Sequence, residues 1–268
     1  MKRVVFLIVA VCFTMFSFAQ EQDASEIVKK ANAAVESKDY EKAVELFESA
    51  LAIPNHGQDE AKINSVLIQL KPIVAKDKAK DALDAKEYDK ALELYKDAMT
   101  DFPDDASIVE QAGIRFYNAG ITSYKSKDYL NAIKCLTLAE KEFKYEKAIK
   151  SKNAVLKKYA EDLVAEGITS AEEVNVSTEN KELLVKSMSN VYFSQGYALY
   201  QSGSAIITTA NEKVSGGSMT TADDAYKAEV EKGKKDFKAA IPLLEKATEL
   251  DPSNANAKKV LDACQKSI

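Results

Sequence analysis

One short pattern recurs four times along this chain and limits its folds more than any other feature. Each copy reads as an acidic residue, an aromatic residue, two further residues, an alanine and an aliphatic residue. A second alanine follows the first by seven positions in every copy. Because residues seven apart share one face of an α-helix, each copy predicts a helix that a neighbouring helix can approach closely. The four copies begin at Asp39, Glu87, Asp128 and Asp236.

Start and stop signals surround these predicted helices. The acidic residue that opens each copy can accept hydrogen bonds from the free N–H groups of the first helical turn. Proline, which ends helices, follows the first, second and fourth copies as Pro54, Pro103 and Pro252. A small residue twelve positions before the first alanine marks a partner helix, as Ala31, Ala79 and Gly120. These signals together predict helical hairpins in series.

The composition agrees with an all-α fold. The 268 residues include only 9 Gly, 5 Pro and no Trp, whereas alanine, lysine, glutamate and leucine are abundant. A β-sandwich or β-barrel would need many short strands joined by turns rich in glycine, and such a fold is therefore excluded.

The repeated pattern resembles the tetratricopeptide repeat (TPR) family, whose unit is a 34-residue helix-turn-helix. The third copy carries the resemblance most fully, over residues 116–129 together with Ala132, Leu136 and Ala139. The resemblance implies an all-α solenoid of helical hairpins, coiled as a right-handed superhelix, over residues 20–268. Its repeats are expected near residues 24–57, 72–105, 113–146 and 189–254.

The copies are unevenly spaced, so additional helices must lie between them. An amphipathic run over residues 59–70 predicts a helix that ends near Pro72. Residues 145–166 predict another helix, with Ile149, Leu156, Tyr159 and Leu163 as its apolar stripe. A polar connection over 167–180 and a helix over 182–200 follow.

The last predicted repeat is split by 32 residues, 204–235, that replace the expected tight turn after Gly203. A Ser-Gly-Gly-Ser sequence at residues 215–218 lies at the centre of this insertion, which predicts a projecting helical hairpin or a partly mobile arm. Residues 255–268 predict a final capping helix, because a solenoid needs a polar outer face at its end.

The amino terminus predicts a secretory signal peptide over residues 1–19. A basic start at Lys2 and Arg3 precedes an apolar run over 4–18, and the small residues Ser17 and Ala19 suit cleavage after Ala19. The apolar run is too short to be expected as a retained membrane anchor. The expected location is therefore the periplasm or the exterior. The ending Ser-Phe-Ala-Gln resembles signal peptides of Bacteroidota.

Several functional classes find little support in the residues. The net charge of -5 argues against binding to nucleic acid. The single histidine, His56, is expected to be an exposed loop residue, since it has no companion ligands for zinc and no nucleophile elbow for hydrolysis. Cys135 and Cys264 are expected to be small buried side chains. We therefore expect neither a cofactor, nor a metal site, nor an enzymatic activity.

The TPR resemblance implies a concave groove lined by the first helix of each pair. The matching positions that would line it are aromatic in the third and fourth copies: Tyr117, Tyr124, Phe193, Tyr197 and Tyr200. Aromatic side chains offer a large contact area at a low entropic cost, which suits recognition of a peptide or helix. The competing interpretation is that several of these rings pack against neighbouring helices. For Tyr124 the groove and the packing interpretations are equally supported.

These observations predict an exported, non-enzymatic scaffold that binds another protein or a peptide in its groove. The alternative is an accessory subunit of an envelope machine for secretion or outer-membrane assembly, docked through residues 204–235. A glycan-binding protein or an enzyme is a third class, which the absence of Trp and of catalytic motifs disfavours.

Overall fold

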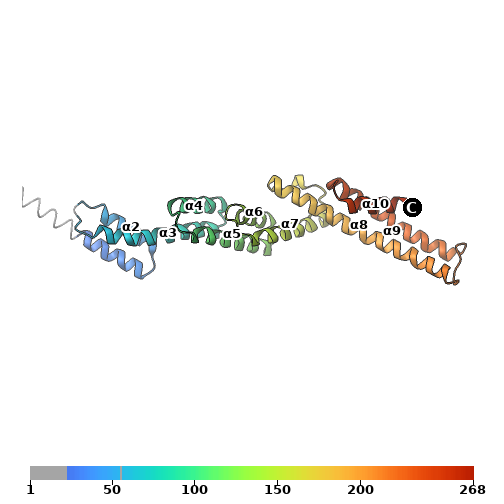
Figure 1. Ribbon diagram of the computed structural model, residues 1–268, viewed down its shortest axis with the longest axis horizontal. Coiled ribbons are helices and arrows are strands. Elements are labelled where there is room, and N and C mark those ends of the chain that lie inside the picture. Colours follow the sequence, from blue (N-terminus) through green and yellow to red (C-terminus); the bar gives the residue numbers. More distant parts are fainter. Residues whose placement is uncertain (1–22, 55) are drawn as a thin grey trace, which may run out of the picture. The chain divides into compact units, whose positions relative to one another are not determined.

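A computed structural model describes residues 23–54 and 56–268, and this part of the chain is all-α (Figure 1). Its helices follow one another as antiparallel hairpins, with one short 3-10 turn. The chain divides into two compact units, the first extending to Phe116 and the second from Tyr117 to Ile268. Each unit is described separately below.

The first unit contains a helix over residues 23–36, α2 (Tyr40–Leu51), α3 (Glu60–Asp84), α4 (Tyr88–Asp101) and the first half of α5 (Ser107–Lys125). The helix over 23–36 and α2 enclose Ala31, Ala43 and Phe47 against the first half of α3, which contributes Ile63 and Leu67. The second half of α3 packs against α4. One helix thus serves two successive hairpins.

The second unit contains the rest of α5, α6 (Tyr129–Lys141), α7 (Lys147–Ala165), a 3-10 turn η1 (Ala171–Glu173), α8 (Thr178–Ser215), α9 (Asp224–Leu250) and α10 (Ala255–Ser267). The α8 and α9 helices lie side by side as a long antiparallel hairpin (Figure 1). The α10 helix covers this hairpin through the buried residues Ala257 and Cys264. Its exposed Lys258, Lys259 and Lys266 give the end of the chain a polar outer surface.

The four copies of the pattern pack in the same way. The first alanine of each copy, at positions 43, 91, 132 and 240, is 0% exposed. A Cβ atom added to Gly120 would meet the Leu136 side chain at 2.7 Å, and one added to Gly196 would meet Leu244 at 2.8 Å. Each leucine lies four residues after the first alanine of its copy, so the third and fourth copies repeat one helix contact. Ala31 and Ala79, also 0% exposed, occupy the matching positions in the first two copies.

The turns inside the first three hairpins are built alike. Lys38, Lys86 and Lys127 have φ angles of 63°, 62° and 61°. In the third turn the Lys127 N–H donates to the Tyr124 carbonyl and the Asp128 N–H to the Ser123 carbonyl, each at 2.9 Å. This pair of bonds defines a Schellman motif, which satisfies the last carbonyls of the preceding helix. The left-handed conformation usually falls to glycine, but here lysine adopts it.

Replacing Lys127 with glycine is therefore expected to stabilise the protein. The change removes the steric cost of a side chain at positive φ, which outweighs the greater freedom of glycine in the unfolded chain, for a gain of about 0.5–1 kcal/mol. Urea denaturation followed by circular dichroism measures it. Lys238→Gly, at an exposed position inside α9, is the matched control and should cost about 1 kcal/mol. Equal effects of the two changes would contradict the role of the turn.

The expectation that a helix ends near Pro72 is wrong, because α3 runs without a break from Glu60 to Asp84 and holds Pro72 in its interior. Proline in a helix interior costs about 3 kcal/mol, since it removes one backbone hydrogen bond and crowds the preceding turn. Packing of α3 against both α2 and α4 offsets this cost. Ile68, the residue whose carbonyl loses its donor, is 71% exposed, so water can reach that turn.

The prediction of a helical hairpin over residues 204–235 is confirmed, whereas the predicted end of the preceding helix at residue 200 is wrong. The α8 helix passes through Gly203 and ends at Ser215, and it is 38 residues long. Residues 204–235 are the distal ends of α8 and α9 with the turn between them, in which Gly217 has a φ of 74°. The insertion is thus a hairpin continuous with the repeat. Gly203 continues the helix because it faces Gly233 across a very close contact: an added Cβ would lie 2.6 Å from the Gly233 carbonyl oxygen.

One residue of the apolar stripe predicted on α7 faces solvent instead of the core. Leu156 and Leu163 are buried as expected, whereas Ile149 is 44% exposed. Ala148 and Lys152 take the inward positions in that part of the helix. The Lys152 ammonium is buried because it forms an ion pair with Glu140 of α6, with 2.5 Å between Nζ and Oε2.

Candidate functional site

The five aromatic residues predicted to line a groove lie in the second unit, on two helices. Tyr117 and Tyr124 are on α5, while Phe193, Tyr197 and Tyr200 are on α8. Tyr117 is partly buried, with its ring centroid 5.3 Å from that of Tyr145. Its hydroxyl accepts a hydrogen bond from the Ser151 hydroxyl of α7 at 3.3 Å. Tyr117 thus packs against its neighbours on one side.

Tyr124 belongs to a second group of rings. Its centroid lies 6.2 Å from that of Tyr129, which stacks on Tyr159 of α7 at 4.9 Å. The Tyr129 hydroxyl donates to Asp162, and this bond, assisted by burial, raises the pKa of Tyr129 to about 12. The pKa of the Asp162 carboxyl is lowered by its hydrogen bond from Lys158, which has the larger effect, and by its hydrogen bond from Tyr129. These hydrogen bonds and ring contacts join α6 to α7, so this group of rings helps to hold the two helices together.

The three residues on α8 form a stacked series that we call the aromatic row: Phe193, Tyr197 and Tyr200. The centroids of Phe193 and Tyr197 are 5.5 Å apart, and those of Tyr197 and Tyr200 are 6.1 Å apart, with interplanar angles of 19° and 23°. Tyr200 also contacts the buried ring of Phe237 on α9 at 5.6 Å. Tyr197, the middle ring, is 37% exposed. The row is therefore anchored in the core at Tyr200 and open to solvent at its centre.

The helix that carries the aromatic row is uncharged over a long stretch. Residues 187–211 of α8 contain no Asp, Glu, Lys or Arg, in a chain in which 29% of residues are charged. Many of these residues are nevertheless exposed, and their side chains are small or amide-bearing: Asn190, Ser194, Gln195, Ala198, Gln201, Ser202, Ala205, Thr208 and Thr209. A solvated helix face normally carries charge, whereas depletion of charge with enrichment of aromatic residues is typical of the centre of a protein interface.

The uncharged stretch is a sequence signal that helix periodicity and repeat register do not detect. Those two patterns identify which positions face inward, but they do not compare the outward positions with the rest of the surface. The distribution of charged residues along the chain is the signal that distinguishes residues 187–211.

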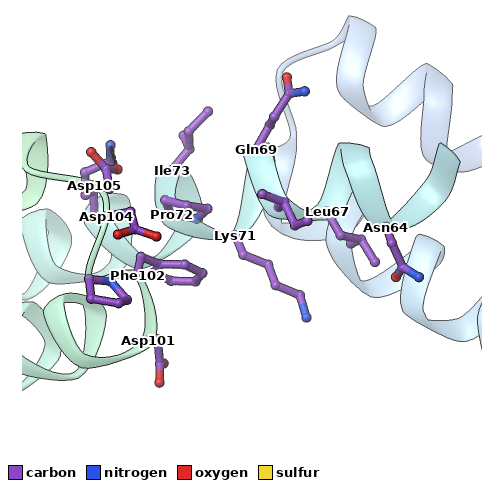
Figure 2. Close-up of a pocket in the computed structure, with 13 residues that line it drawn as sticks. Asn64, Leu67, Gln69, Lys71, Pro72, Ile73, Asp101, Phe102, Asp104 and Asp105 are labelled. Atoms are coloured by element: carbon purple, nitrogen blue, oxygen red, sulfur yellow. Dashed lines mark hydrogen bonds and ion pairs between the residues drawn. The ribbon is translucent and has the colours of Figure 1, made fainter. Parts of the chain in front are cut away.

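A separate hollow lies in the first unit, between α3 and the segment that follows α4 (Figure 2). Its volume is about 830 Å³. Figure 2 shows the Phe102 ring extending from that segment toward the turn of α3 that holds Pro72. Apolar side chains form much of its wall: Leu67, Ile68, Pro72, Ile73, Phe102 and Pro103. No sequence motif marks the hollow, because it depends on α3 continuing past Pro72.

His56, expected to be exposed, is instead 7% exposed. Its Nδ1 accepts a hydrogen bond from the Gln58 N–H at 3.0 Å, and its Nε2 lies 3.3 Å from Glu60. These two contacts use both ring nitrogens to hold the segment before α3. Cys135 and Cys264 are buried, as expected, and burial raises the pKa of the Cys264 thiol.

Across residues 23–54 and 56–268, no group of three or more His, Cys, Asp and Glu side chains could hold a metal ion. In the same part of the chain, no helix is both long enough and apolar enough to cross a membrane.

No family model and no curated protein matches the chain. The chain is similar to the crystal structure of a TPR repeats protein from Bacteroides fragilis NCTC 9343, with 18% sequence identity and a TM-score of 0.31. That likeness covers 91% of this chain and 99% of the other.

Proposed function

We propose that the protein is a non-enzymatic, TPR-like scaffold that binds another protein or a peptide through the aromatic row and the uncharged face of α8. The TPR assignment is supported by the equivalent packing of the four alanines and by the shared Gly120 and Gly196 contacts. We also propose that the protein acts outside the cytoplasm, in the periplasm or beyond. Residues 1–19, on which this rests, lie outside the described residues.

One observation carries the binding proposal: a partly exposed stack of three rings lies within 25 consecutive uncharged residues. Rings that stack on one another are already ordered, so little conformational entropy is lost when a partner binds them. The absence of ammonium and carboxylate groups removes the desolvation cost that a charged face would add. A partner surface of apolar and uncharged polar groups would fit.

Photo-crosslinking in intact cells tests this proposal. A photoreactive amino acid at position 197 should crosslink to a discrete partner, and Tyr200→Ala in the same chain should reduce the yield about tenfold, because loss of an interface tyrosine commonly weakens binding by that factor or more. The matched control places the same group at position 149 of α7, where an isoleucine is similarly exposed at 44%.

Equal crosslinking from positions 197 and 149 would contradict the proposal. A third position, Thr221 in the exposed turn between α8 and α9, separates the alternative function. Crosslinks to envelope proteins from position 221 and not from 197 would favour an accessory subunit docked through the distal hairpin.

A further inference from the structure

The hollow beside Pro72 has an apolar floor, by which we mean Leu67, Ile68 and Phe102, and the described fold leaves this floor uncovered at Ile68. Ile68 is 71% exposed, the largest exposed fraction among the large hydrophobic residues in the described part of the chain. Phe102 is partly buried, and Leu67 reaches the hollow from the core of the first hairpin. Removing the exposed apolar surface of Ile68 from water would be favourable, so the floor suits an apolar side chain.

Pro72 removes one backbone hydrogen bond from the helix at the floor of the hollow. In an α-helix the N–H of residue 72 would donate to the carbonyl of residue 68, but proline has no N–H. The Ile68 carbonyl therefore lacks its usual helical donor, and both Ile68 and Pro72 line the hollow.

The lysines that line the hollow have acidic partners, whereas two of its aspartates have no basic partner in the part of the chain that the structure describes. Lys71 pairs with Glu48 at 2.6 Å, and Lys76 pairs with Asp105 at 3.0 Å while also donating to the Ser107 hydroxyl. The two lysines of the wall are thus neutralised within the first unit. By contrast, the Asp101 and Asp104 carboxylates of the wall are exposed and form no ion pair within the described residues. The hollow consequently combines an apolar floor with an excess of negative charge.

We propose that this hollow binds a short segment of another protein in which aliphatic side chains are flanked by lysine or arginine. The aliphatic group lies over Ile68, and the basic side chains approach Asp101 and Asp104. This site differs from the uncharged face of α8 in both its place in the chain and its chemistry. It therefore goes beyond the function proposed above and does not depend on it.

Fluorescence anisotropy with defined peptides tests the proposal on the purified full chain. The probe is a dye-labelled Gly-Lys-Leu-Leu-Lys-Gly peptide, and two comparison peptides replace its lysines with glutamate or its leucines with serine. We expect saturable binding of the probe and at least tenfold weaker binding of both comparison peptides. Equal binding of the three peptides, or no binding of the probe, would overturn the proposal.

Two test variants, each with a matched control, show whether the probe binds at the hollow. Ile68→Asp should weaken the probe about tenfold, since it replaces the apolar floor with a charge, while Ile149→Asp, at the exposed isoleucine of α7, should leave affinity unchanged. Asp101→Asn with Asp104→Asn should weaken the probe several-fold and reduce its salt dependence. Glu212→Gln with Glu231→Gln makes the same change in net charge at exposed sites in the second unit and should have no effect.

Circular dichroism of each variant checks that its helices remain intact, which is expected because all the substituted side chains are at least partly exposed. Equal losses in a test variant and its matched control would overturn the assignment to the hollow. Tyr200→Ala should leave binding of the probe unchanged. This result separates failure of the present proposal from failure of the proposed function of α8.

Discussion

Replacing Glu140 with alanine is expected to lower the free energy of unfolding of the second unit by about 3–5 kcal/mol, the range for breaking a buried ion pair from one side. The reason is the burial of its partner: the Lys152 side chain is 3% exposed, whereas that of Glu140 is 23% exposed. Without Glu140 the ammonium group would remain between α6 and α7 with its nearest countercharge removed. Urea denaturation followed by circular dichroism measures the loss.

A surface pair on the same helix provides the control. Lys158 and Asp162 of α7 lie 2.7 Å apart, but the side chain of Lys158 is 44% exposed. Asp162 also accepts a bond from Tyr129, so the control substitution is Lys158→Ala, which should cost less than about 1 kcal/mol. The double change Lys152→Met with Glu140→Leu should recover most of the stability, because well-packed apolar residues often replace a buried pair without loss. A small effect of Glu140→Ala would mean that water reaches Lys152.

The second large effect is expected at the crossing of α8 and α9. A Cβ atom on Gly203 would lie 2.6 Å from the Gly233 carbonyl oxygen and 2.9 Å from the Phe237 ring. The obstacle is partly backbone and cannot rotate away, so Gly203→Val should separate the helices and destabilise the second unit by about 3 kcal/mol, at the upper end for overpacking. Hydrogen exchange of the amides of residues 224–236 should rise along with the loss measured by urea denaturation.

Gly196→Ala offers a graded comparison on the same helix. Its added methyl group would meet the Leu244 side chain at 2.8 Å, and a side chain can change rotamer, so we expect a cost nearer to about 1 kcal/mol. If Gly203→Val and Gly196→Ala cost the same, the close contact of the two backbones is not what fixes the hairpin. Because Tyr200 rests on Phe237, Gly203→Val should also weaken any binding that depends on the aromatic row.

The repeated hairpins follow well from the sequence because their signals are local. An alanine or glycine at a helix contact, an acidic residue at a helix start and a proline beyond a helix end act within a few residues of their own positions. The buried alanines at positions 43, 91, 132 and 240 show how directly this information determines packing. The three residues of the aromatic row were expected from the TPR resemblance, whereas the uncharged stretch around them required a comparison with the whole surface.

The expectations that proved wrong have a common physical cause. From neighbouring residues alone, Pro72 is read as a helix end and the helix over 182–200 is expected to stop before Gly203, since proline and glycine each weaken a helix in isolation. In the folded protein, α3 packs against both α2 and α4, and the close approach of Gly233 requires a glycine at position 203. His56 is similar: a lone histidine in a loop suggests exposure, yet Gln58 and Glu60 engage both of its ring nitrogens in a nearly buried position.

The sequence alone therefore determined that this chain forms helices, where most of them begin, and which small residues join them into hairpins, because these properties depend on short-range sterics and hydrogen bonding. Only the tertiary structure decided that two helices continue through their apparent stops, that Lys152 is buried beside Glu140, and that a hollow opens at Pro72. Those outcomes depend on contacts between residues distant in the chain, whose energies exceed the local preferences that they override.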